Sequence, residues 1–168
     1  MISELHTQRG FTLIESLVYI ALFVIVSAAA FIALMHYYAL FQQYQVRQAL
    51  FHTGTSAMER VLLEVREAED IDQDQSVWTA NHGHLILTVD GEQREVVLVD
   101  GVLELRTPEA TTSLNDERVR IDTFTLYPYT SGGITLVRVR IQATSQRDTY
   151  QESWEWESAA VARGTYSE

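Results

Sequence analysis

The chain lacks cysteine and lysine and has only two prolines in 168 residues. Without cysteine, no disulfide can cross-link the fold, whatever the redox state of its compartment. All 12 basic residues are arginines, and 23 acidic residues outnumber them, which gives a formal net charge of −11. A surface of this sign repels nucleic-acid backbones, whose binding rests largely on Lys and Arg contacts. We therefore expect no direct binding of nucleic acid.

Charged residues are also absent from Ser16 to Val46, a stretch long enough to cross the ~30 Å hydrocarbon core of a bilayer. One acidic residue, Glu15, stands directly at the start of this stretch. A central acidic residue in a membrane span costs roughly 2.5–3.5 kcal/mol, and less near an end, so Glu15 requires a partner. The residues leading to it are Arg9-Gly10-Phe11-Thr12-Leu13-Ile14-Glu15.

This segment resembles the type IV prepilin signature, which is shared by type IV pilins and by the pseudopilins of type II secretion and DNA-uptake machines. The resemblance covers Arg9 to Glu15, and the uncharged stretch extends it to about Phe41. It implies that a prepilin peptidase removes a leader, residues 1–10, by cutting between Gly10 and Phe11. It also implies that Phe11, the new terminal residue, is N-methylated.

Removal of the leader would leave a cationic amine on Phe11, about 6 Å along the helix axis from Glu15. In a stack of subunits, the Glu15 carboxylate is placed to neutralise the Phe11 amine of the next chain. Opposite charges attract strongly in a low-dielectric core, where either alone is costly. The resemblance implies that this pairing sets the register of subunits in a filament. The other expected assembly contacts are three apolar residues on the same helical segment: Leu13, Ile14 and Leu17.

The resemblance also implies partners and a location. The expected partners are other pilin or pseudopilin subunits, the prepilin peptidase and an inner-membrane assembly platform. The chain is expected to cross the cytoplasmic membrane once, with its N-terminus in the cytoplasm, and to enter a filament later. This orientation rests on the resemblance, because Arg9 is offset by Glu4. Many true pilins close a C-terminal loop with a disulfide, so the lack of cysteine favours a pseudopilin or minor subunit. The arginine-punctuated amphipathic stretch 57–70, and a late Arg-rich strand before a Trp-rich one, loosely resemble the J-type minor pseudopilins.

Other interpretations compete with this one. The small residues Ser27 to Ala30 resemble an ordinary signal-peptidase site, but hydrophobicity resumes from Phe31 to Phe41, as in a membrane anchor. A signal-anchored extracytoplasmic binding module that never polymerises is the main alternative. An anchored hydrolase is a further rival, but the sequence has no Gly-x-Ser-x-Gly elbow and no phosphate-binding glycine motif. We predict that the protein is not an enzyme and has no cofactor.

Apolar residues continue at helical spacing beyond the uncharged stretch, so one helix is expected from Thr12 to about Glu69. Gly54 is its weak point, since glycine costs about 1 kcal/mol relative to alanine, and two helices meeting near Gly54 are the alternative. The residues predicted to be buried are Val46, Leu50, Phe51, Ala57, Met58, Val61, Leu62, Val65 and Ala68.

Beyond Asp70 the hydrophobic period changes from helical to two. Asp90-Gly91 and Asp100-Gly101 separate apolar runs and predict a three-stranded meander. Residues 107–116 are predicted to be an exposed loop, and further strands are predicted at 118–127, 134–143 and 150–159. The fold is therefore predicted to be α+β, a long N-terminal helix packed on an antiparallel β-sheet head. The predicted parts are the leader 1–10, a transmembrane or filament-core helix 11–41, its amphipathic continuation 42–70 and a β-rich head 71–168.

Four charged residues of the last two strands are expected to share one outer face of the sheet: Arg138, Arg140, Glu155 and Glu157. Trp154 and Trp156 lie on the opposite face, where at least one is expected in the core.

Two sets of polar residues resemble metal ligands. Asp70, Asp72 and Asp74 alternate as at the opening of a calcium loop, but Gln75 stands where the loop's glycine is required. His82 and His84 have no cysteine and no evident third ligand nearby. We therefore predict no metal site.

Overall fold

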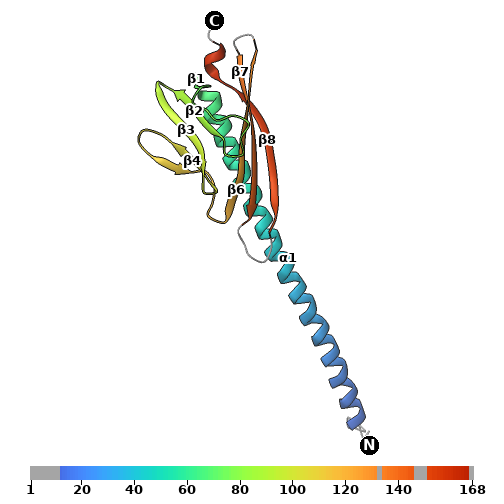
Figure 1. Cartoon of the computed structure of the whole chain (residues 1–168). Helices are drawn as coiled ribbons and strands as arrows, with labels where there is room; N and C mark the ends of the chain where they lie inside the picture. The colour runs from blue at the N-terminus through green and yellow to red at the C-terminus, as the bar shows by residue number, and fades with distance from the viewer. Residues whose placement is uncertain (1–11, 132–133, 146–150, 167–168) are drawn as a thin grey trace, which may run out of the picture. The chain divides into compact units, whose positions relative to one another are not determined.

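The structure is a computed structural model, and it describes residues 12–131, 134–145 and 151–166 (Figure 1). Its first element is helix α1 (Leu13–Glu67), 55 residues long. The helix continues through Gly54, so the alternative of two helices meeting there is wrong. The chain divides into two compact units, with the boundary between Gln42 and Gln43.

A first antiparallel sheet of five strands follows α1 in the second unit, in the order β1-β2-β3-β4-β5. The predicted meander forms its centre. The strands are β1 (Asp70–Ile71), β2 (His84–Val89), β3 (Glu92–Val99), β4 (Val102–Arg106) and β5 (Thr111–Ser113).

Both Asp-Gly turns form as the sequence predicts. Asp90 and Gly91 have φ angles of 52° and 77°, and Asp100 and Gly101 have φ angles of 50° and 88°. Positive φ at both central residues is the geometry of the two-residue turn that suits the twist of a hairpin. Glu92 pairs directly with Val89, so the first turn is as short as the second.

The prediction of a loop over 107–116 is wrong for Thr111–Ser113, which form β5 and pair with β4. All three residues of β5 are polar and exposed. A short edge strand of this kind buries no side chain, so it leaves no hydrophobic alternation in the sequence.

The second sheet has three antiparallel strands in the order β6-β7-β8. They are β6 (Val119–Ser131), β7 (Ile134–Ser145) and β8 (Ser153–Val161), followed by the short 3₁₀ helix η1 (Arg163–Tyr166). The β6 strand extends beyond its predicted end at Tyr127, and Pro128 lies within it. Tyr150, where we expected the last strand to begin, is outside the described residues.

The core of the second unit joins α1 from Leu50 onward to both sheets. Val61 and Val65 of α1 are fully buried, as are Val96 of β3 and Ile141 of β7. Of the nine helix residues predicted to be buried, only Phe51 is not, since its side chain is 57% exposed. The α+β fold class is confirmed.

Gly54 has a different role from the bend that its low helix propensity suggested. A Cβ atom built on Gly54 would lie 2.3 Å from two ring atoms of Trp156 on β8. No side chain fits there, so glycine allows the indole of Trp156 to lie directly against the helix backbone. Trp156 is half-buried and packs on the core, whereas Trp154 is exposed and meets Phe51 edge-on.

Candidate functional site

The described structure of the assembly segment begins at Thr12, so Gly10 and Phe11, the residues predicted for cleavage and methylation, lie outside it. Thr12 caps helix α1. Its Oγ1 accepts a hydrogen bond from the backbone N–H of Glu15 at 3.3 Å, as an N-cap threonine does. The first turn of α1 is therefore stabilised by the motif residues themselves. The spacing Thr12-x-x-Glu15 is that of a capping box, a signal that our sequence analysis did not use.

Glu15 lies in the first turn of α1, where a carboxylate interacts favourably with the helix dipole. Glu15 is exposed, and within the described residues no ion pair involves its carboxylate. The three apolar residues predicted to accompany it, Leu13, Ile14 and Leu17, are 85%, 73% and 62% exposed. The structure thus places all four on open helix surface.

The same exposure continues along α1 up to Phe41. The helix contains an apolar stretch long enough to cross a membrane, and no residue in it is buried. The polar ring of His36 can lie within this apolar stretch because its Nδ1 donates a hydrogen bond to the Ile32 carbonyl oxygen at 2.9 Å. Such a helix near the N-terminus fits a membrane-anchored protein.

A second glutamate of α1, Glu64, behaves in the opposite way. It is fully buried, and its Oε2 accepts a hydrogen bond from Arg94 of β3 at 2.9 Å. Its Oε1 lies 2.8 Å from Nη2 of Arg60, one helical turn earlier. The hydrogen bond with Glu64 raises the pKa of Arg94. Our sequence analysis missed this cluster, although Glu64 falls on the same helical face as Val61, Val65 and Ala68.

A third glutamate, Glu152, binds the part of α1 at the start of the second unit. Nε of Arg47 lies 2.7 Å and 2.8 Å from its two carboxylate oxygens, and Gln43 donates to Oε1 at 3.2 Å. The hydrogen bond from Arg47 lowers the pKa of Glu152 below its ordinary value. This contact ties α1 to the residues that precede β8.

The predicted charge pairs on the outer face of the β7–β8 ladder are confirmed. Arg138 lies 2.8 Å from Glu157, and Arg140 lies 2.8 Å from Glu157 and 3.5 Å from Glu155. Both guanidinium groups also lie over the ring of Tyr127 on β6, at 5.2 Å and 5.7 Å. The pairs are exposed, so they fix the register of the strands more than they stabilise the fold.

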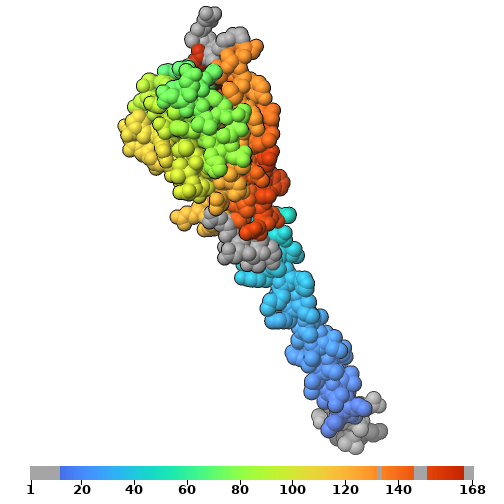
Figure 2. Space-filling view, viewed as in Figure 1, coloured from blue at the N-terminus to red at the C-terminus, as the bar shows by residue number. Residues whose placement is uncertain are grey.

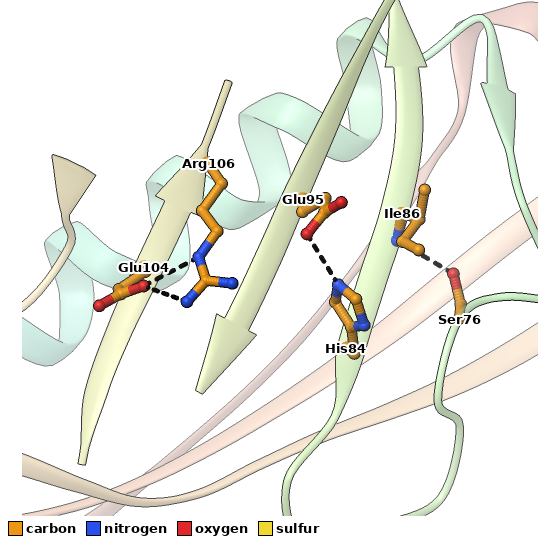
Figure 3. Close-up of polar contacts among 6 residues, drawn as sticks. All are labelled: Ser76, His84, Ile86, Glu95, Glu104 and Arg106. Carbon is orange, nitrogen blue, oxygen red and sulfur yellow. Dashed lines mark hydrogen bonds and ion pairs between the residues drawn. The ribbon is translucent and has the colours of Figure 1, made fainter. Parts of the chain in front are cut away.

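Asp72 and His84, two of the polar residues that resembled metal ligands, have structural partners. Asp72 Oδ1 accepts hydrogen bonds from the backbone N–H groups of Asp74 and Gln75, at 3.1 Å and 2.9 Å. His84 lies 3.3 Å from Glu95 across the β2–β3 pair, beside the Ser76–Ile86 contact (Figure 3). Over the described ranges, no group of three or more His, Cys, Asp or Glu residues is placed to hold a metal ion.

Comparison with known proteins identifies a matching family model. The family model of the prokaryotic N-terminal methylation motif matches residues 5–31. No curated protein and no solved structure matches the chain significantly. The matched residues include Gly10, Phe11 and Glu15 and continue into the exposed apolar part of α1. The match to this N-terminal motif supports a resemblance to type IV pilin-like proteins and pseudopilins.

Proposed function

We propose that the chain is the precursor of a structural, non-enzymatic subunit of a type IV pilus-like filament or a type II secretion pseudopilus. The observation that carries this proposal is the methylation motif over residues 5–31, joined to an apolar helical stretch in which no residue is buried. An exposed apolar helix needs either lipid or other apolar helices around it. A subunit that leaves the membrane for a filament is surrounded first by lipid and then by other apolar helices.

Processing prepares the chain for assembly. The peptidase cuts after Gly10, and the new terminal residue, Phe11, is methylated. The amine of Phe11 and the carboxylate of Glu15 then carry opposite charges at the start of the same helix. A neighbouring subunit brings its own amine to Glu15, and the apolar residues Leu13, Ile14 and Leu17 pack between helices.

The strength of the pair between the Glu15 carboxylate and a neighbour's amine depends on the dielectric around it. In a low-dielectric filament core, an unpaired carboxylate costs several kcal/mol, and its attraction to an amine is strong. Glu15 therefore favours the one register in which it meets an amine. Support for this role comes from the open helix surface around Glu15, where the described residues provide no ion-pair partner.

Before assembly the subunit waits in the cytoplasmic membrane, with its N-terminus in the cytoplasm and its head outside. It consists of the leader 1–10, the membrane or filament-core helix 11–41, the continuation 42–70 and the head 71–168. The absence of cysteine favours a pseudopilin or minor subunit, and the chain loosely resembles the J-type minor pseudopilins. Its partners are other subunits, the prepilin peptidase and the assembly platform.

The test is processing-dependent incorporation in the native host. Gly10→Val should block removal of the leader and keep the chain in the membrane fraction, with at least a tenfold loss from sheared fibres. The matched control, Gln8→Val in the same leader, should be processed and incorporated normally. Absence of the unaltered chain from fibres, or normal maturation of Gly10→Val, would overturn the proposal.

A further inference from the structure

The two sheets have four outer edges, and three of them are short or covered. The β1 strand has two residues and the β5 strand has three. The outer edge of β6 makes backbone hydrogen bonds with two connecting segments. The bonds are Phe124 N–H to Asn81 O (2.8 Å), Gly83 N–H to Phe124 O (2.7 Å), Thr79 N–H to Leu126 O (2.9 Å) and Ile121 N–H to Gly101 O (2.9 Å).

The fourth edge belongs to β8. Among the described residues, β8 pairs with β7 alone, over all nine positions from Ser153 to Val161 and without a register shift. It lies on the outside of its sheet (Figure 1), and its residues form part of the molecular surface (Figure 2). The strand contains no proline and no lysine, the residues that often protect exposed edges.

Two hydrogen bonds show which backbone groups of β8 face outward. Ser145 donates to the Glu152 carbonyl at 3.0 Å, and Ala162 donates to the Thr135 carbonyl at 3.2 Å. Hydrogen-bonded pairs alternate along an antiparallel ladder, so the even-numbered residues between these two bonds face β7. The N–H and C=O groups that point away from the sheet therefore belong to Ser153, Glu155, Glu157, Ala159 and Val161.

The side chains beside this edge define the chemistry of a strand that would pair with it. Glu155 and Glu157 are exposed on the outer face. Glu157 already pairs with Arg138 and Arg140 at 2.8 Å, whereas Glu155 is more exposed and lies 3.5 Å from Arg140, so a basic residue on an added strand is favoured beside Glu155. On the inner face Trp154 is 56% exposed and meets Phe51 of α1, with their ring centroids 6.4 Å apart. The inner side chains of an added strand meet this aromatic pair and are favoured when apolar.

A second copy of β8 fits this edge poorly. Antiparallel pairing of two β8 strands brings glutamates of one copy near those of the other, and like charges opposite each other destabilise a ladder. The whole chain is also strongly acidic, with a net charge of −11. The occupant is therefore a different chain.

We infer that the outer edge of β8 binds an extended strand of a neighbouring, non-identical filament subunit, in which basic and apolar residues alternate. The backbone hydrogen bonds provide the pairing, and the alternation provides the specificity. This inference rests on the proposed function, because the neighbour is another subunit of the same filament.

Amide hydrogen exchange tests the inference on the full mature chain, compared in detergent micelles and in native fibres. In fibres, the amides of Glu155, Glu157 and Ala159 should exchange at least 100-fold more slowly than in micelles. Those of Trp156 and Ser158 face β7 and should be slow in both states. Unchanged exchange at the three outward amides in fibres would overturn the inference and leave the proposed function intact.

The same comparison separates the remaining outcomes. Protection of the outward amides in concentrated micelles of the pure chain would identify a second copy as the occupant and overturn our assignment. A chain that never enters fibres would overturn both the inference and the proposed function. Protection confined to fibres supports the strand of a different subunit.

A proline substitution gives a second test. Ala159→Pro removes an outward N–H, so it should leave the β7–β8 hydrogen bonds and the melting temperature nearly unchanged while reducing incorporation into fibres at least tenfold. The control is Thr111→Pro, at the first residue of the short edge strand β5, which should be incorporated normally. Normal incorporation of Ala159→Pro would contradict the inference. If Ala159→Pro does not fold, hydrogen exchange on the unaltered chain decides.

Discussion

Two glutamates on helix α1 lie in opposite environments. Glu15 stands among exposed apolar residues, and the described residues give its carboxylate no ion-pair partner. Glu64 is completely buried in the second unit, and two arginines of the same chain, Arg60 and Arg94, neutralise it. The fold itself therefore neutralises the carboxylate of Glu64, whereas the described residues do not neutralise that of Glu15.

The apolar residues of α1 follow the same division. Between Leu13 and Phe41 the large hydrophobic side chains are exposed, whereas from Val46 onward one face of the helix is buried. The second part of α1 finds its partners in the sheets of the head. The first part requires lipid or neighbouring helices, which the proposed move from a membrane to a filament would supply.

The largest expected effect concerns Glu15. Glu15→Val should leave cleavage after Gly10 intact but reduce incorporation into fibres at least tenfold, because the amine of a neighbour is left unpaired. The conservative variant Glu15→Asp should retain part of the incorporation. The comparison requires that the melting temperature of the head stay unchanged in both variants. Normal incorporation of Glu15→Val would contradict the pairing.

The opposite result is expected for Glu64. Glu64→Gln leaves two arginines without their counter-charge and should lower the free energy of unfolding by about 3 kcal/mol, the lower end of the cost of breaking a buried ion pair. Removal of the leader should be unaffected. Denaturant unfolding followed by tryptophan fluorescence measures the effect, and Glu59→Gln, at an exposed position of α1, is the control. Equal stability of the two variants would show that the buried cluster has no stabilising role.

A smaller effect is expected at Gly54. Gly54→Ala gains about 1 kcal/mol of helix propensity but places a Cβ against Trp156, and overpacking costs typically 1–3 kcal/mol. The net result should be destabilisation, whereas Ser56→Ala on the exposed side should stabilise slightly. Adding Trp156→Leu should make the effect of Gly54→Ala less unfavourable. Stabilisation by Gly54→Ala alone would exclude the close contact.

The smallest effect is expected at Glu152. Because Arg47 lowers its pKa in the folded chain, Glu152 stabilises the fold above its ordinary pKa of 4.5, and this contribution is lost as the pH falls through the lowered value. Glu152→Gln should therefore weaken the pH dependence of the melting temperature below about pH 5, most visibly at low salt. Arg47→Met should have the same effect. An unchanged acid profile in both variants would show that the pair is not formed in solution.

The sequence predicted the parts of the fold that patterns of hydrophobicity and turn residues determine. The helical spacing from Val46 to Ala68 gave the buried face of α1, and the two Asp-Gly pairs gave the meander. The outer-face pairing of Arg138 and Arg140 with two glutamates followed from strand alternation.

Other features depend on contacts between distant segments, which local patterns do not contain. Polar β5 pairs with β4 through the backbone and buries no side chain. The burial of Glu64 requires Arg94, thirty positions later in the chain, and the glycine at position 54 is explained by Trp156 on β8. The prediction that Phe51 is buried is wrong, because helical spacing cannot show where the covering sheet ends. At the N-terminus the motif identified the candidate site, and the described residues add the cap at Thr12 and the open surface around Glu15.

The most direct test is the mass of the N-terminal peptide in protein recovered from native fibres. Our account predicts a peptide that begins at Phe11 and carries one methyl group on its amine. A fibre-associated chain that retains residues 1–10, or one that begins beyond Glu15, would contradict it.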